Sequence, residues 1–196
     1  MLYSVSEATR ELPYSTSALC CVAAYEGKAR NHTATLRDQP MSNSPKNFRH
    51  HSVVHASIDD VMRFHNAPNA LAVLTPPPVV VQIIRDGRIS LTQGEIDFRL
   101  WFGPIPVRWK AGHEPGPIPT SFVDRMLSGP MAHWKHEHCF REVAAGVELT
   151  DTLTYAHYLG WQGILSRLVF DGPALRALFR YRHWRTHHAL RHPSPG

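Results

Sequence analysis

Six runs of alternating apolar and polar residues follow the proline triplet at residues 76–78, and this series limits the fold more than any other feature. Alternation is typical of half-buried strands, and the short turn dipeptides between the runs favour antiparallel hairpins. The predicted strands cover residues 79–84, 89–100, 105–112, 118–127, 132–142 and 147–155, with turns at Asp86-Gly87, Gly103-Pro104, Gly116-Pro117, Gly129-Pro130 and Ala145-Gly146. We therefore expect a six-stranded antiparallel meander.

The segments on either side of this series add one strand and several helices. Residues 48–54 are strand-like, and Ser57 is a predicted N-cap for a short helix that extends to Phe64. Residues 71–74 allow one further helical turn before the prolines. The chain then ends in a helical region, residues 161–190, that Asp171-Gly172-Pro173 is expected to kink. Its predicted apolar stripe consists of Leu165, Leu168, Val169, Leu175, Leu178 and Phe179. This order predicts an α+β fold with two small helices after the first strand and a sheet wrapped around the terminal helix.

The first 47 residues show little periodicity and are rich in polar residues and proline towards Asn47. We interpret residues 1–47 as a disordered or mis-assigned extension, with Met41 as a candidate translation start, and expect residues 1–40 to add nothing to the core. The folded domain is predicted to cover residues 48–190, followed by a flexible tail at residues 191–196.

Composition excludes several classes of protein. No apolar run reaches the roughly 20 residues of a membrane-spanning helix. The cysteines, Cys20, Cys21 and Cys139, form neither a disulfide framework nor a paired Cys-x-x-Cys metal site, which favours a reducing, cytoplasmic setting. The formal charge of +5 is partly local, because residues 176–191 hold five arginines and no acidic residue. This stretch is a solvated helix face or a contact for an anionic partner, and nucleic-acid binding is not expected.

Strand parity in the last three strands assigns the side chains that face inward. In the run that begins at Trp134, the aromatic and histidine positions alternate with Lys135, Glu137, Cys139 and Arg141, which places Cys139 on the outer face. The inward set is Phe122, Asp124, Met126, Trp134, His136, His138, Phe140, Asp151, Leu153 and Tyr155. It mixes aromatic residues with four ionisable ones, which need partners because an unpaired buried charge costs several kcal/mol.

The partners depend on the register of two hairpins. A turn at Gly129-Pro130 would bring Phe122 near His136. A turn centred between Ala144 and Ala145 places His138 opposite Asp151, whereas a turn on Ala145-Gly146 places Phe140 there. We expect the carboxylate to raise the pKa of His138 where water or ligand reaches it, and burial to lower that pKa otherwise.

His136 and His138 lie two residues apart on one strand face, as two metal ligands can, but the sequence offers no evident third ligand beyond Asp124 or Asp151. A hydrogen-bonded network uses the same residue types, so no metal site and no cofactor are predicted. A histidine held by a carboxylate also suits acid–base catalysis.

The pattern Phe122-x-Asp124, Gly129-Pro130, Trp134-x-His136-x-His138-x-Phe140, Asp151 and Tyr155 resembles the SRPBCC or START-like superfamily. Within it, the chain is most similar to uncharacterised bacterial ligand-binding SRPBCC proteins related to polyketide cyclases/dehydrases. The resemblance also includes Phe64-His65, Arg108-Trp109 and the Gly160-x-x-Gly163 step. It implies a helix-grip fold, in which a seven-stranded curved antiparallel sheet encloses an apolar cavity beneath a long C-terminal helix. Met126 and Met131 depart from the residues usual in the superfamily, which affects the cavity lining more than the fold.

Two functional hypotheses follow. The first is a carrier or sensor that binds a small hydrophobic molecule, such as a lipid or polyketide, in a cavity lined by Trp109, by the inward set and by the terminal helix. The alternative is a cyclase- or dehydratase-type enzyme that uses the inward His/Asp cluster. A third, an interaction module acting through the basic terminal helix, has less support in the sequence.

Overall fold

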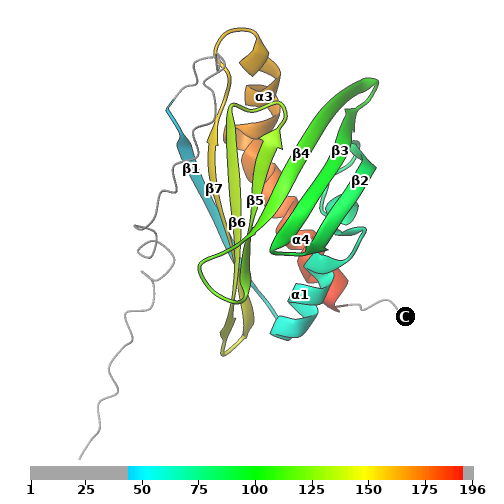
Figure 1. Ribbon diagram of the computed structural model, residues 1–196. Helices are drawn as coiled ribbons and strands as arrows, with labels where there is room; N and C mark the ends of the chain where they lie inside the picture. The colour runs from blue at the N-terminus through cyan, green and yellow to red at the C-terminus, as the bar shows by residue number, and fades with distance from the viewer. Residues whose placement is uncertain (1–43, 192–196) are drawn as a thin grey trace, which may run out of the picture. The chain divides into compact units, whose positions relative to one another are not determined.

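The computed structural model describes residues 44–191, which form one antiparallel sheet and four helices. The strands are β1 (Lys46–Val54), β2 (Val80–Ser90), β3 (Gln93–Phe102), β4 (Ile105–Pro115), β5 (Ser121–Ser128), β6 (His133–Val143) and β7 (Gly146–Ala156), in the order β1-β7-β6-β5-β4-β3-β2. The helices are α1 (Ile58–Asn66), α2 (Ala70–Val73), α3 (Gln162–Phe170) and α4 (Gly172–Arg191). Figure 1 shows the sheet curving around α4, which confirms the predicted α+β helix-grip architecture.

The predictions for residues 1–40, for Met41 as a start and for residues 192–196 lie outside the described residues. At the edges of the folded part, β1 begins at Lys46, two residues before the predicted strand, and α4 extends to Arg191. No helix in the part that the structure describes is long and apolar enough to cross a lipid bilayer.

Helix α1 begins where the sequence predicts, because Ser57 caps it. The Ser57 Oγ accepts a hydrogen bond from the Asp60 backbone N–H at 3.2 Å, and Asp59 and Asp60 lie in the first turn, where the helix dipole favours negative charge. After α2, the prolines end helical structure, and the Pro77-Pro78 peptide bond is cis.

Removal of the Ser57 cap is expected to cause a modest loss of stability. Ser57→Ala is expected to lower the free energy of unfolding by about 1 kcal/mol, because the Asp60 N–H loses its acceptor. Ser57→Asn, which restores an acceptor at the N-cap, is the control and is expected to regain most of that loss. Urea unfolding of the three proteins measures the difference, and an unchanged midpoint for Ser57→Ala would contradict the capping role.

The predicted turn at Asp86-Gly87 is wrong, because these residues continue β2. Gly87 pairs with Glu95 in the β2–β3 ladder, and Arg88 holds the Asp86 carboxylate through both its guanidinium and its backbone N–H. The chain turns instead at Leu91-Thr92, where Ser90 Oγ accepts a hydrogen bond from the Thr92 N–H. A local ion pair therefore overrides the turn tendency of Asp-Gly.

The two later hairpins settle the register of the inward residues. The loop after β5 is centred on Pro130, so Phe122 lies opposite His138 and Asp124 opposite His136, which corrects the predicted approach of Phe122 to His136. This register differs from the predicted one because residues 131 and 132 are held by contacts inside the domain. Met131 is fully buried, and the Ala132 N–H donates a hydrogen bond to the Ala156 carbonyl. The β6–β7 turn is centred between Ala144 and Ala145, and His138 lies opposite Asp151 as one of the two predicted registers requires.

The terminal helical region is two helices rather than one kinked helix. Asp171 has an extended backbone, Gly172 has φ +51°, and Pro173 follows, so the helix stops and restarts there. The Asp171 carboxylate fixes this break, since it accepts hydrogen bonds from the Tyr155 hydroxyl, the Gly172 N–H and the Lys46 ammonium group. The apolar stripe is only partly as predicted: Leu175 and Phe179 are buried, whereas Leu165 and Leu168 are exposed.

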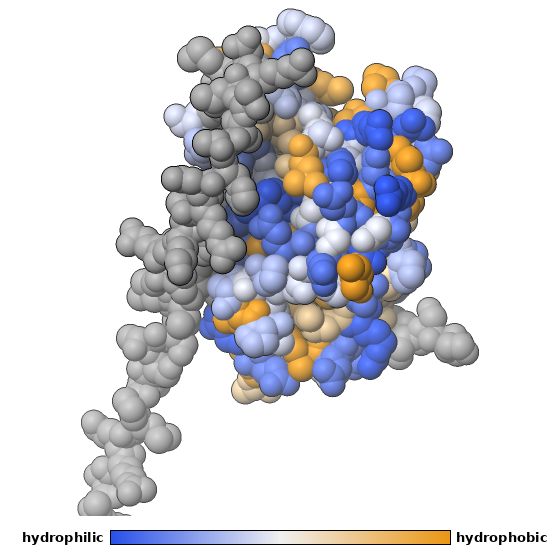
Figure 2. Space-filling view, in the orientation of Figure 1, coloured by the Kyte–Doolittle hydropathy of each residue, from blue (hydrophilic) through white to orange (hydrophobic). Residues whose placement is uncertain are grey.

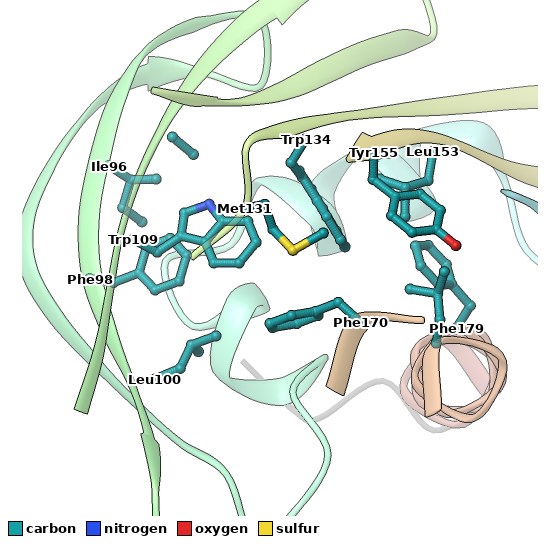
Figure 3. Close-up of a cluster of buried hydrophobic side chains, with 12 residues drawn as sticks. Ile96, Phe98, Leu100, Trp109, Met131, Trp134, Leu153, Tyr155, Phe170 and Phe179 are labelled. Atoms are coloured by element: carbon teal, nitrogen blue, oxygen red, sulfur yellow. The ribbon is translucent and has the colours of Figure 1, made fainter. Parts of the chain in front are cut away.

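The core lies between the sheet and α3–α4. Figure 3 shows Trp109 and Trp134 on either side of Met131, with Phe170 beneath them and Phe179 of α4 beside Leu153 and Tyr155. A second apolar cluster, around Val61 of α1, includes Phe122, Phe140 and Leu149. In Figure 2 the surface that the sheet turns to the viewer is mainly hydrophilic with scattered apolar side chains.

A candidate ligand cavity with a buried histidine–aspartate cluster

A cavity of about 630 Å³ lies between the inner face of the sheet and the helices. Its wall is mostly apolar, with side chains from the sheet on one side and from all four helices on the other. The apolar lining includes Leu71, Leu74, Ile96, Phe98, Leu100, Trp109, Ala111, Phe122, Met126, Trp134, Val169, Phe170 and Leu178. Polar residues also line it, namely His65, Arg88, His113, Asp124, His136, His138 and Arg182.

The structure places most of the predicted site residues at this wall. Those that line the cavity are Trp109, Phe122, Asp124, Met126, Trp134, His136 and His138. Phe140 and Asp151 instead line a separate void of about 10 Å³, since Phe140 is covered by the His65 ring of α1 at a centroid distance of 4.7 Å. Leu153 and Tyr155 lie in the core cluster with Phe179, and none of these three side chains lines the cavity. Contact of any of these residues with a ligand stays a prediction.

Asp151 is the centre of a buried cluster. Its side chain is 7% exposed, and three imidazoles approach its two oxygens. His136 Nε2 lies 3.0 Å and His138 Nδ1 2.8 Å from Oδ1, while His183 Nε2 of α4 lies 2.8 Å from Oδ2. The His183 Nδ1 in turn lies 2.6 Å from the Ser52 hydroxyl of β1. One carboxylate therefore connects β6, β7 and α4, and through Ser52 reaches β1.

Asp124 extends the cluster to the cavity. Its side chain is 25% exposed, and its Oδ2 lies 3.3 Å from the remaining nitrogen of His138, Nε2. Its Oδ1 lies 3.2 Å from His113 Nε2, a distance that permits an ion pair, although the geometry is not that of a hydrogen bond. His138 is thus held between two carboxylates, with Asp124 on the cavity side and Asp151 on the core side.

The two carboxylates set the protonation of the cluster. Burial alone would lower the pKa of His138, but the charges and hydrogen bonds of Asp151 and Asp124 outweigh burial and raise this pKa to about 9. Burial would likewise raise the pKa of each carboxyl group, yet the neighbouring histidines, His138 first, hold both pKa values well below the ordinary range. At neutral pH, His138 is therefore an imidazolium between two carboxylates, although its side chain is only 3% exposed.

Two histidines whose rings lie beside that of His138 are neutral. Burial and the positive charge of His138 lower the pKa of His136 to about 4, against the opposing effect of Asp151. The same two causes lower the pKa of His65 to about 3. The Nδ1 of His65 lies 2.9 Å from the Val61 carbonyl, so in the neutral ring Nδ1 carries the proton and Nε2 is an acceptor.

Asp124, His136 and His138 each offer a ligand atom within 4.8 Å of the others, so these side chains could hold a divalent ion. However, both nitrogens of His138 already contact carboxylates, and a metal ion would have to displace its proton. The arrangement suits a proton-holding network better, with His138 as donor.

Sequence reasoning missed several residues of the site. His183 is one of three imidazoles on Asp151, yet its position among the arginines and histidines of α4 carries no local signal. The wall formed by α1 and α2, with Leu71 and Leu74, was also missed, because it depends on how these helices pack over the sheet. Cys139 is buried rather than exposed on the outer face, since it pairs across the sheet with the buried Ser121 and Thr150.

No family model matches the sequence, and no curated protein matches it. Solved structures do match. Protein CV1439 from Chromobacterium violaceum is 15% identical, with a TM-score of 0.55, over 74% of this chain and 97% of that one. Norcoclaurine synthase from Thalictrum flavum, in complex with dopamine and hydroxybenzaldehyde, is 16% identical over 87% of this chain and 100% of its own, with a TM-score of 0.55. The ZhuI aromatase/cyclase from Streptomyces sp. R1128 is 19% identical over 74% and 91%, with a TM-score of 0.50. At such identities the likeness shows a shared fold.

Proposed function

We propose a ligand-binding function for this chain, which has the helix-grip fold of the SRPBCC superfamily to which these structural neighbours belong. Its ligand is a small, largely apolar molecule held in the cavity, and its role is that of a carrier or sensor. The observation that carries this proposal is the cavity of about 630 Å³, whose wall is mainly apolar. This volume lies within the roughly 300–1,000 Å³ of small-molecule sites, and a few polar groups at one part of such a wall usually orient the ligand.

The test is to replace a small residue of the cavity wall with a large one. Ala111 of β4 is 6% exposed and lines the cavity, so Ala111→Phe adds a ring to the space that a ligand needs. We expect the neutral dye N-phenyl-1-naphthylamine to bind the wild-type protein with saturation at one site, and the variant to bind it about tenfold or more weakly. Fluorescence titration measures both affinities.

Ala145→Phe is the matched control, because it makes the same change in the exposed β6–β7 turn. It is expected to leave dye affinity unchanged. Non-saturating dye binding, or equal affinities in all three proteins, would contradict binding in this cavity.

A second candidate function, general-acid catalysis, is favoured by one specific observation. His138 carries its proton at neutral pH because two carboxylates hold it, and Asp124 lies between this imidazolium and the cavity. An acid of this kind, with its proton passed on through Asp124, can protonate a leaving hydroxyl group, and the neutral His136 at the cavity wall can take the proton that the substrate loses from carbon. A dehydratase requires both transfers. A pKa of about 9 favours proton donation over proton abstraction.

Comparison of binding with turnover separates the two candidates. If the protein is a carrier, His138→Gln changes ligand affinity, and the bound molecule keeps its mass during incubation with the wild-type protein. If it is a dehydratase, the wild-type protein releases a product lighter by one water, and His138→Gln abolishes this change. Mass spectrometry of the ligand that co-purifies with the protein, before and after incubation, distinguishes these outcomes.

A further inference from the structure

Helix α3 presents three of its apolar side chains to solvent and buries a glycine, a serine and Phe170. Trp161, at its N-cap, is 80% exposed, and Ile164, Leu165 and Leu168 are 57%, 44% and 71% exposed. These four positions follow helical spacing and form one stripe, called the α3 stripe below. The opposite face buries Gly163 and Ser166 together with Phe170. This pattern is the reverse of an ordinary surface helix, whose apolar face is covered.

The α3 stripe reaches the rim of the ligand cavity. Leu168 is both strongly exposed and part of the cavity wall, and the next two residues, Val169 and Phe170, line the cavity further in. Figure 1 shows α3 at one end of the domain, immediately before the start of α4. Whatever covers the stripe therefore lies at an edge of the cavity.

The net charge of the chain segment that carries the stripe indicates what can cover it. Between residues 152 and 191 the sequence holds six arginines and a single acidic residue, Asp171. The Asp171 carboxylate is already bound to Lys46, Tyr155 and the Gly172 N–H, so it leaves the cationic excess of this segment in place. Arg176 and Arg180, in the first half of α4, are exposed. An anionic surface complements this charge.

We propose that the α3 stripe docks the protein on the surface of an anionic lipid bilayer. A short apolar stripe containing tryptophan, accompanied by exposed arginines, has the character of a helix that lies in the membrane interface. Anionic headgroups attract the cationic excess of this segment, while Trp161 and Leu168 enter the boundary between headgroups and acyl chains. The cavity rim then faces the bilayer. Docking through the exposed residues of the α3 stripe is independent of what the cavity holds.

Flotation of the full chain with lipid vesicles tests this proposal. Vesicles of phosphatidylcholine alone are compared with vesicles of phosphatidylcholine and phosphatidylglycerol in a ratio of roughly 2:1. We expect binding to the anionic vesicles that weakens when the salt concentration rises from about 20 mM to about 500 mM, because salt screens the arginines. The double variant Trp161→Ser/Leu168→Ser is expected to bind about tenfold or more weakly.

Ile89→Ser is the matched control, because Ile89 is 75% exposed on β2, away from α3. It is expected to keep full vesicle binding. The proposal is overturned if neither kind of vesicle binds the wild-type protein, or if the double variant binds as well as the wild type. It is also overturned if light scattering shows that the wild-type protein is a dimer and the double variant a monomer, and vesicles do not bind the wild type. In that case a second copy of the chain covers the stripe.

Discussion

Replacement of Asp151 by asparagine is expected to lower the free energy of unfolding by about 3–5 kcal/mol, the usual cost of removing one partner from a buried ion pair. The carboxylate contacts His136, His138 and His183 within 3.0 Å and is 7% exposed, so no water replaces it. An asparagine side chain keeps the shape but offers one acceptor oxygen and no charge. The His138 imidazolium then faces Asp124 alone, and the pKa of His138 falls.

For a domain of this size, that loss lowers the thermal midpoint by roughly 6–20 °C and leaves the protein folded at room temperature. Thermal unfolding followed by circular dichroism measures the shift. Glu95→Gln is the control, because Glu95 pairs with Lys110 at an exposed position, where an ion pair adds little. Equal midpoints for Asp151→Asn and Glu95→Gln would show that Asp151 does not hold the cluster together.

Mild acid is expected to destabilise the protein strongly, through the two neutral histidines. Burial keeps the folded-state pKa at about 4 for His136 and about 3 for His65, whereas both rings titrate near 6.5 in the unfolded chain. Below about pH 6.5 the unfolded state therefore binds more protons, and stability falls as the pH approaches 4. The neighbours that act on these rings are His138 and Arg182, which oppose protonation, and Asp151, which favours it.

The opposite sign applies to His138. Its pKa is raised to about 9, so its contribution to stability is complete below about pH 6.5 and is lost as the pH rises through 9. We therefore expect the unfolding free energy to be greatest near pH 6–7 and to drop by several kcal/mol by pH 4.5. Urea unfolding at a series of pH values measures this profile.

A variant isolates the histidine contribution to that profile. His136→Gln removes one titrating group, so its stability is expected to depend less steeply on pH between about 6.5 and 4 than that of the wild type. His51→Gln, at an exposed position of β1, is expected to retain the full slope. Equal slopes for the wild type and His136→Gln would mean that His136 takes up no protons on unfolding in this range.

Local rules accounted for much of the fold. The helix start at Ser57 and most of the hairpins followed from capping and turn chemistry, because those signals act within a few residues. The errors arose where distant contacts decide. The Asp86-Gly87 segment remains a strand because it pairs with Glu95 and Ile96 of β3, and Arg88 also binds Asp86 there. Leu168 is apolar and helical but exposed, which no periodicity could reveal.

Strand parity predicted the part of the candidate site that lies on the sheet. Parity placed His136 and His138 on the inner face, and one of the two predicted registers placed His138 opposite Asp151. The third imidazole on Asp151, His183, comes from α4, and the sequence does not reveal which turn of a helix meets a given strand. For the same reason, the wall contributed by α1 and α2 required the tertiary structure.

Binding of a small apolar molecule in the cavity is the central claim, and native mass spectrometry of the full chain purified from its own host tests it most directly. We predict one small molecule bound per wild-type chain, with no such adduct on Ala111→Phe and the same adduct on the Ala145→Phe control. A wild-type protein without an adduct, or an adduct that persists unchanged in Ala111→Phe, would contradict the claim.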